Sequence, residues 1–186
     1  NIGSFMINQG LGTALGGMPD NSLTASRAGA SDSFTRFNLD LARIQQLGRK
    51  GSSFLILRGN AQIATNPLVV GEMYSLGGYD SVRGYAQSEF LGDNGWMLSA
   101  EYRHSLNKSQ TNPLQAALFL DTGGVSIKNP QPGQKGDQSL TGAGIGLRYA
   151  IGENTNFRVD WGFPLSPKQN SLNQNSVLYG LFMARF

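Results

Sequence analysis

The sequence predicts an all-β protein, namely a transmembrane antiparallel β-barrel to which this chain contributes eight strands. Three observations predict this fold class. Eight segments alternate apolar and polar residues with the period of two that is typical of strands. The polar faces of these segments carry charged side chains, which suits a barrel with a polar lumen and an apolar exterior. Long and short connections alternate along the chain, as they do in transmembrane barrels.

The first four expected strands cover about residues 3–15, 33–46, 53–65 and 96–106. Their apolar faces carry, in that order, Phe5 with Ile7, Leu39 with Leu41, Leu55 with Leu57, and Trp96 with Leu98. Their opposite faces carry Ser4 with Asn8, Arg36 with Asp40, Arg58 with Asn60, and Glu101 with Arg103. Successive side chains of a strand point to opposite faces, so each segment has one apolar and one polar face.

The last four expected strands cover about residues 114–124, 139–151, 155–165 and 176–186. Their apolar faces carry Leu118 with Leu120, Ile145 with Leu147, Val159 with Trp161, and Leu178 with Phe182. The opposite faces of the first three carry Phe119 with Asp121, Gly146 with Arg148, and Arg158 with Asp160. The same strand period therefore continues to the last residue, Phe186.

A soluble β-sandwich shows the same alternation, and the charged faces decide against it. In a membrane barrel the apolar faces meet lipid, and the charged faces line the lumen. The expected lumen charges are Arg36, Arg58, Glu101, Arg103, Arg148, Arg158 and Asp160. We interpret these seven as a solvated wall. Aromatic residues near segment ends, among them Trp96, Tyr149 and Phe157, suit the aromatic belts of a membrane protein.

Composition narrows the functional classes. The chain has 186 residues, a formal net charge of +3 and no cysteine. Its length suggests one domain, so we take 1–186 as a single barrel domain. The lack of cysteine excludes a disulfide scaffold and a thiol-based metal site. The basic residues are scattered, which does not favour a nucleic-acid partner. A strand-like start without a signal-peptide pattern leads us to expect a mature portion or a fragment.

The connections alternate in length. Long ones are expected at about 16–32, 66–95, 125–138 and 166–175, and short ones at about 47–52, 107–113 and 152–154. The longest, 66–95, carries apolar residues such as Val70, Leu76 and Val82, too many to leave in water. Its glycine pairs permit sharp bends, and Arg83 lies in its middle. We expect this loop to fold inward and to dock through Arg83.

The loop raises a question of barrel width. The interior of a closed eight-strand barrel is filled by its own side chains and has no room for such a loop. An open sheet would leave two unpaired edges in lipid. Two alternatives remain open: a wider barrel, completed by absent sequence or by a second copy of the chain, or a closed eight-strand barrel with the loop displaced.

Two motifs in this order resemble a known family. The first is LGG at 76–78 followed by SVRGY at 81–85, and the second is FLDTG at 119–123. They are similar to the inward-folded loop motif and a strand motif of the two-partner secretion transporters, the TpsB or hemolysin-activator type of the BamA-like superfamily. The resemblance is specific over about residues 68–186, and it implies that the chain is the C-terminal half of a sixteen-strand barrel.

The resemblance also implies roles for individual residues. The loop-docking residues are Val82, Arg83, Gly84 and Tyr85, and the lumen-wall residues that receive them are Phe119, Asp121 and Gly123. Strand parity places the second set on the lumen face, so Arg83 gains an acidic partner in Asp121. Glycines 142, 144 and 146 leave a smooth track on the neighbouring strand for the loop. The terminal Phe186 is an interfacial anchor, part of the signal read by the barrel-assembly machinery, or both.

The implied function is passive translocation of a secreted, hemolysin- or adhesin-like polypeptide by an integral protein of the bacterial outer membrane. The implied partners are outer-membrane lipid, the secreted polypeptide and the barrel-assembly machinery, with self-association as a way to complete a wider barrel. We expect no catalytic residues, no metal and no cofactor, because a single histidine without cysteine leaves few catalytic sets. The alternatives are an assembly or insertion factor for other barrels, and a truncated structural barrel without transport activity.

Overall fold

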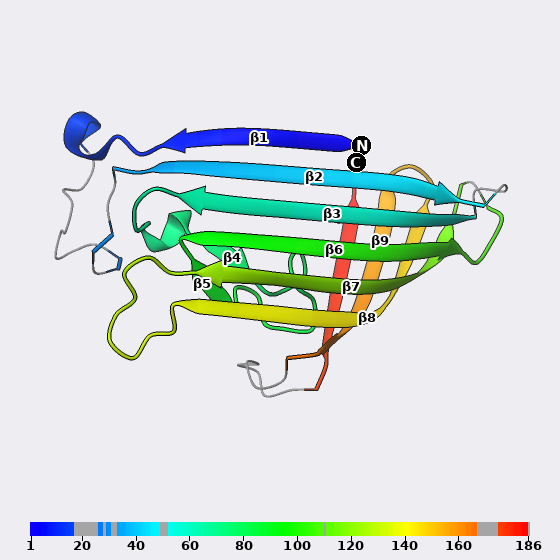
Figure 1. The fold of residues 1–186 in the computed structure, drawn as a ribbon. Helices are drawn as coiled ribbons and strands as arrows, with labels where there is room; N and C mark the ends of the chain where they lie inside the picture. The colour runs from blue at the N-terminus through cyan, green and yellow to red at the C-terminus, as the bar shows by residue number, and fades with distance from the viewer. Residues whose placement is uncertain are drawn as a thin grey trace.

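One antiparallel sheet dominates the structure, a computed structural model (Figure 1). It describes residues 1–16, 26–27, 29–30, 33–48, 52–109, 111–166 and 175–185. The strands are β1 (Ile2–Gln9), β2 (Thr35–Leu47), β3 (Ser53–Ala64), β6 (Asn94–Ser105), β7 (Leu114–Ser126), β8 (Asp137–Ile151), β9 (Thr155–Pro164) and β10 (Val177–Ala184). They lie side by side in chain order, each antiparallel to the next, which confirms the predicted fold class.

Two of the sequence expectations are wrong in detail. The first strand was expected to reach residue 15, but β1 ends at Gln9 and a 3-10 helix, η1 (Gly12–Leu15), follows. Gly12 has a φ of 54°, which takes the backbone out of the extended region. The loop 66–95 is also not free of strands.

Within that loop lie the 3-10 helix η2 (Val70–Glu72) and the short strands β4 (Tyr74–Leu76) and β5 (Phe90–Gly92). The two strands pair with each other as a separate antiparallel sheet. The last residues of the expected loop belong to β6. Three-residue strands are too short for an alternating pattern to reveal them in sequence.

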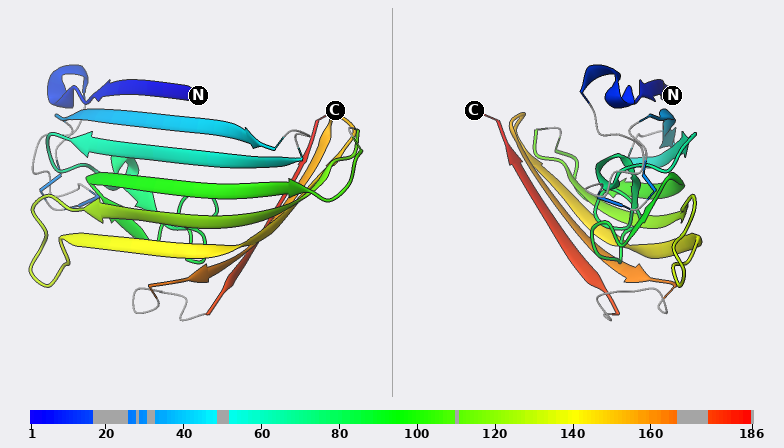
Figure 2. Two further views of the ribbon diagram at one scale, coloured as in Figure 1. Left: turned by 45° about the vertical axis from the view of Figure 1, so that its right-hand side comes forward. Right: turned by 90° about the vertical axis from the view of Figure 1, so that its left-hand side faces the viewer.

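The large sheet curls, and the 66–93 segment lies on its concave side (Figure 2). β4 and β5 pack there against β6 and β7. The edge strands β1 and β10 lie apart in Figure 2, and among the described residues they do not pair with each other. The structure thus shows an open, curved sheet around the loop instead of a closed eight-strand barrel.

The loop supplies much of the core on the concave side. Leu76, Val82 and Tyr85 of the loop are buried against Met97, Val125 and Leu140 of strands β6, β7 and β8. A second, smaller cluster joins Phe34, Ala64 and Leu68 where the loop begins. Burial of one such side chain stabilises the fold by about 1.5–3 kcal/mol. The apolar content of the loop therefore explains why it folds inward.

The convex side of the sheet is apolar and uncovered. Leu39, Leu118, Ile145 and Trp161 are between 41% and 57% exposed there. In a soluble sandwich these four side chains would be buried together between two sheets. No second sheet packs against this side in the described part of the chain. The alternative of a soluble sandwich is therefore wrong.

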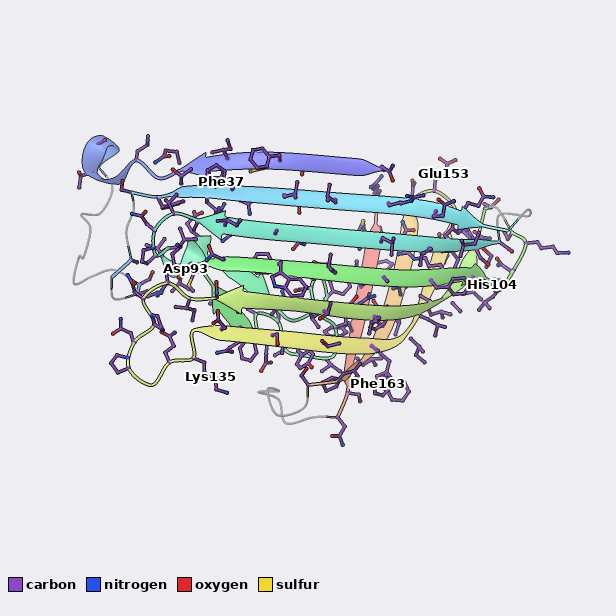
Figure 3. All side chains as sticks on the ribbon, in the orientation of Figure 1. Phe37, Asp93, His104, Lys135, Glu153 and Phe163 are labelled. Atoms are coloured by element: carbon purple, nitrogen blue, oxygen red, sulfur yellow. The ribbon has the colours of Figure 1, made fainter. Side chains whose placement is uncertain are left out.

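Aromatic side chains gather near the strand ends. At the end with the long connections, the rings of Phe5 and Phe37 are stacked with centroids 6.3 Å apart. At the end with the short turns, the ring of Phe157 lies 6.4 Å from that of Tyr149 and 4.9 Å from that of Phe182. Figure 3 labels Phe37 and His104 at the two opposite ends.

Helices contribute little to the described residues. None of them is both long enough and apolar enough to cross a membrane.

Candidate functional site

The tip of the inward-folded loop is a tight turn that presents Arg83 to the sheet. Gly77 and Gly78 have φ angles of 101° and 104°, which side chains other than glycine rarely adopt. The turn closes when the backbone N–H of Gly78 donates to the carbonyl oxygen of Val82 at 3.0 Å. The hydroxyl of Ser81 accepts a further hydrogen bond from the N–H of Gly77 at 3.2 Å. These two hydrogen bonds, both within the tip, hold its turn.

Arg83 and Asp121 form a forked ion pair between the loop and β7. Nε of Arg83 donates to Oδ2 of Asp121 at 2.7 Å, and Nη2 donates to Oδ1 at 2.9 Å. The hydroxyl of Ser99 also donates to Oδ1 at 2.7 Å. The exposed fractions are 3% for Arg83 and 0% for Asp121, so the pair is shielded from bulk water. A guanidinium and a carboxylate in this geometry give a directional contact.

Arg83 makes three more contacts beyond Asp121. Its Nη1 donates to Oε2 of Glu101 at 2.7 Å and lies 3.6 Å from Oδ2 of Asp160. Its guanidinium carbon lies 3.5 Å from the centroid of the Phe119 ring, a cation–π arrangement. Burial alone would lower the pKa of Arg83, but its hydrogen bonds to Asp121 and Glu101 raise that pKa above the ordinary arginine value. The guanidinium therefore stays charged.

A network of further charges surrounds this contact. Arg148 lies 3.2 Å from Glu101 and 2.7 Å from Asp160. Arg103 pairs with Glu101 at 2.6 Å, and Arg158 pairs with Asp160 at 2.6 Å. Glu101, Arg148 and Asp160 are buried. The interpretation of these three as a solvated wall is wrong, because they are buried, and Glu101 and Asp160 lie against Arg83 of the docked loop.

Two of the predicted lumen charges lie outside this network. Arg36 forms an ion pair with Glu72 of η2 at 2.9 Å, so it contacts the loop near its start. Arg58 is exposed, and within the described residues it makes no ion pair. The structure thus brings Arg36 to the loop but leaves Arg58 in the open part of the concave face.

Glycines allow the loop and the wall to approach closely. A Cβ atom at Gly142 would collide with the carbonyl oxygen of Arg83. A Cβ atom at Gly84 would lie 2.8 Å from the carbonyl carbon of Phe163, and Gly84 also has a φ of 101°. At Gly123 a Cβ atom would lie 2.6 Å from the Leu76 side chain. These glycines are therefore required by contact between the loop and the strands.

Of the three glycines that were expected to accommodate the loop, only Gly142 does so. Gly142 receives the loop, but a Cβ atom at Gly144 would collide with the ring of Phe119. One at Gly146 would collide with the carboxylate of Asp160. Gly144 and Gly146 therefore make room for side chains of neighbouring strands.

The loop also meets the last strand, a contact that the sequence did not suggest. The hydroxyl of Tyr179 accepts from the N–H of Gly84 at 3.0 Å and donates to the carbonyl oxygen of Tyr85 at 2.6 Å. Tyr85 is buried, and its own hydroxyl donates to the carbonyl oxygen of Thr141 at 2.7 Å. The only indication in the sequence was strand alternation. Tyr179 follows the outward-facing Leu178 in β10, so alternation places its side chain on the inner face. Phe186 lies outside the described residues, so its role stays a prediction.

Comparisons with known proteins agree on one family. A family model of haemolysin secretion/activation proteins of the ShlB/FhaC/HecB type matches residues 3–149. The heme/hemopexin transporter protein HuxB of Haemophilus influenzae is 29% identical over 147 residues, which cover 76% of this chain and 26% of that protein. The chain thus spans about a quarter of the length of this relative.

The fold of a solved structure also matches. CdiB from Escherichia coli superposes with a TM-score of 0.73 at 21% sequence identity, over 90% of this chain and 31% of that one. At this identity the match supports the fold alone. The family model, however, covers most of the chain. The chain therefore belongs to the haemolysin secretion/activation family of ShlB, FhaC and HecB, the outer-membrane β-barrel transporters of two-partner secretion.

Proposed function

We propose that this chain forms part of an outer-membrane transporter that translocates a secreted partner polypeptide. The observation that carries the proposal is the buried fork between Arg83 and Asp121, which holds a long loop on the concave side of the sheet. A loop held inside a barrel obstructs the lumen and therefore limits which molecules can pass through the barrel. Family membership supports a polypeptide destined for secretion as the cargo.

The two faces of the sheet support a position in the membrane. The convex face exposes apolar side chains from every region of the sheet, among them Leu41, Leu98, Leu118, Ile145 and Leu178. Exposed apolar patches of this extent mark an interaction surface, and a curved sheet with a polar concave side suits lipid as the partner. We propose that the chain is integral to the bacterial outer membrane.

The open sheet supports a wider barrel. Unpaired strand edges are costly in lipid, so β1 and β10 need partners. The concave side is already occupied by the loop, which leaves no room for β1 and β10 to close on each other. We propose that residues 1–186 are one half of a sixteen-strand barrel domain. Further strands of the same protein fit the share of HuxB that the chain covers, and a second copy is the alternative source.

The remaining lumen arginines are candidates for contact with the passing polypeptide. Arg58 is exposed, whereas Arg103 and Arg158 are partly exposed and paired with Glu101 and Asp160. Their charges would attract acidic segments of the cargo. The family description suggests a hemolysin-like cargo, whereas HuxB is described as a heme/hemopexin transporter. A hemolysin- or adhesin-like polypeptide is therefore our proposal for the cargo class.

The test is substitution of Arg83 by alanine in the full-length protein, with secretion of its partner polypeptide as the readout. We expect secretion to fall strongly while the amount of heat-modifiable barrel in the outer membrane is unchanged. Arg43→Ala is the matched control, because Arg43 is exposed and bonds only its neighbour Gln45 among the described contacts. Normal secretion by the Arg83→Ala variant would overturn the proposal.

A further inference from the structure

We propose that Asp93 is a positioning residue that closes the neck of the inward-folded loop and anchors it independently of Arg83. This inference rests on the proposed function, since it concerns how the loop is held in the lumen. The neck is defined as Leu68, which follows β3, and Asp93, which precedes β6. Leu68 lies near the start of the 66–93 segment, and Asp93 is its last residue.

A single carboxylate joins both ends. The backbone N–H of Leu68 donates to Oδ1 of Asp93 at 2.6 Å. The N–H of Lys128, in the connection between β7 and β8, donates to Oδ2 at 2.6 Å. Asp93 is fully buried. A buried carboxylate that accepts backbone N–H groups on both oxygens has a defined position.

Arg27 supplies the balancing charge from a third connection. Its Nη1 lies 2.7 Å from Oδ1 and 2.9 Å from Oδ2 of Asp93, and its Nη2 donates to the carbonyl oxygen of Lys128. The connections β1–β2, β3–β6 and β7–β8 thus meet on one carboxylate. Figure 3 shows Asp93 at the end of the sheet where these long connections lie.

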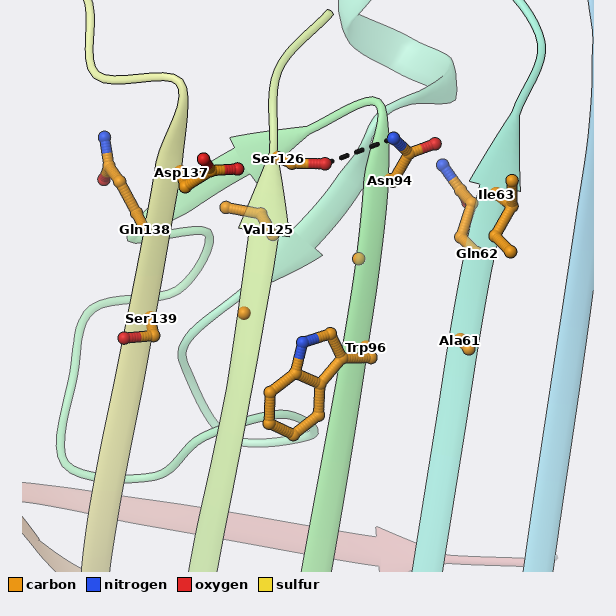
Figure 4. A pocket seen from close by; sticks show the side chains of 12 residues that line it. Ala61, Gln62, Ile63, Asn94, Trp96, Val125, Ser126, Asp137, Gln138 and Ser139 are labelled. Atoms are coloured by element: carbon orange, nitrogen blue, oxygen red, sulfur yellow. Dashed lines mark hydrogen bonds between the residues drawn. The ribbon is translucent and has the colours of Figure 1, made fainter.

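The residues around Asp93 fix its backbone. Asn94 accepts from the N–H of Ala64 at 2.9 Å and donates to the hydroxyl of Ser126 at 3.1 Å, the bond drawn in Figure 4. The side chain of Gln62 donates to the carbonyl oxygen of Asp93 at 3.2 Å. Strands β3, β6 and β7 are therefore tied together immediately beside the neck.

The neck and the tip share no residue. Arg83 contacts Glu101, Asp121, Asp160 and Phe119, whereas Asp93 contacts Arg27, Leu68, Gln62 and Lys128. Loss of the tip contacts thus removes no partner of Asp93. During passage of a polypeptide the tip can leave Asp121 while the neck holds, so the loop pivots about its neck and stays in the barrel.

The experiment measures tip and neck separately in the full-length protein, by pulsed electron–electron resonance distances between spin labels. This region lacks native cysteine, so labels can be placed in pairs. Gln87→Cys with Ile145→Cys reports on the tip, and Val70→Cys with Leu98→Cys reports on the neck. All four positions are exposed. The pairs are combined with Asp93→Asn, with Arg83→Ala and with Asp137→Asn.

We expect Asp93→Asn to replace the narrow neck distance by a broad distribution and to leave the tip distance narrow. Arg83→Ala should broaden the distribution of the tip distance and leave the neck distance narrow. Asp137→Asn makes the same chemical change at an exposed aspartate at the same end of the sheet, and both distances should stay narrow. Broadening of both pairs, or of neither pair, by Asp93→Asn would overturn the inference, as would broadening of the neck by Arg83→Ala.

A second variant tests the same inference if the Asp93→Asn protein does not assemble. Arg27→Ala removes the guanidinium but keeps the two backbone bonds to Asp93, so the neck distance should broaden less and the tip distance should stay narrow. An unchanged neck distance in Arg27→Ala would contradict the role of that ion pair. These distances do not depend on cargo. If Arg83→Ala secretes normally, the proposed function fails, and the distances still decide whether the loop has two anchors.

Discussion

Arg83 and Asp121 meet through two parallel hydrogen bonds, 2.7 Å from Nε to Oδ2 and 2.9 Å from Nη2 to Oδ1. The two residues lie 38 positions apart and come from a loop tip and a strand. Neither is accessible to bulk water, so each compensates the buried charge of the other. The loop is thus attached to the wall by an ion pair. Removal of either residue leaves the charge of the other buried without this partner.

The first prediction is that Asp121→Asn releases the loop tip. Removal of one partner of a buried ion pair costs about 3–5 kcal/mol, because the other charge is left uncompensated. Glu101 still contacts Arg83, so we expect the lower end of that range. Limited proteolysis of the 66–93 segment in the purified, detergent-solubilised protein measures the release.

Asp40→Asn serves as the control for Asp121→Asn. Asp40 is exposed and accepts one hydrogen bond from Ser4 at 3.2 Å. The control should be cleaved at the rate of the parent protein. Equal protection of the loop in Asp121→Asn and in the parent would show that the fork does not hold the tip.

The second prediction is that Arg83→Lys does not restore docking. A lysine ammonium keeps the charge but cannot form the planar fork, and it cannot reach Asp121 and Glu101 in the same geometry. We expect secretion by Arg83→Lys to resemble that of Arg83→Ala more than that of the parent. Secretion near the parent level would mean that a positive charge at residue 83 is enough to dock the loop, without the planar fork.

The third prediction concerns close approach at Gly142. Alanine there places a methyl group against the carbonyl oxygen of Arg83, so the loop must shift away from β8. Overpacking of this kind typically costs about 1–3 kcal/mol. We expect faster proteolysis of the loop without loss of the barrel, measured in the same assay as for Asp121→Asn.

Gly180→Ala is the matched control for this change. Gly180 lies in β10, and a Cβ atom there would meet no atom within 4 Å. The same substitution should therefore leave the loop protected. Cleavage of both variants at one rate would indicate that contact at Gly142 is not what holds the loop.

The fourth prediction addresses the cation–π contact of Phe119. Leucine at this position keeps an apolar side chain but removes the ring that lies 3.5 Å from the guanidinium carbon of Arg83. The loss should be about 0.5–2 kcal/mol, smaller than that for Asp121→Asn. Proteolysis of the loop in Phe119→Leu should thus fall between the rates of the parent and of Asp121→Asn. A rate at or above that of Asp121→Asn would reverse this order of contributions.

The fifth prediction concerns Phe186. If Phe186 is read by the barrel-assembly machinery, Phe186→Ala should lower the amount of heat-modifiable protein in the outer membrane. The barrel that does assemble should secrete normally. Arg185→Ala is the adjacent control, because a signal specific to Phe186 predicts that this variant assembles like the parent. Parent-like assembly of Phe186→Ala would leave only an anchoring role for the ring.

The strands and their faces could be predicted from the sequence because they are local properties. Alternation of side chains follows from the extended backbone, so Leu118 and Asp121 could be assigned to opposite faces. Apart from β1, the ends of the eight long strands lie within a few residues of their predicted positions. β1 is the exception, since it ends at Gln9 and the chain enters the 3-10 helix η1 at Gly12. The pairing of Arg83 with Asp121 was also predicted, but from two motifs and parity together.

The buried charges could not be predicted, because burial depends on where the loop lies. Glu101 and Asp160 alternate like any polar-face residues, and in the folded structure they are buried beside Arg83 of the loop. Asp93 gave no signal at all, since its partner Arg27 lies 66 positions away in another connection.

The sequence by itself thus determined eight strands with one apolar and one charged face, and a loop with enough apolar residues to fold inward. Only the tertiary structure decided which charges the loop covers, that Asp93 closes its neck, and that the sheet remains open. The reason is physical: a strand's two faces follow from neighbouring residues, whereas burial and ion pairing between distant residues follow from the curvature of the whole sheet.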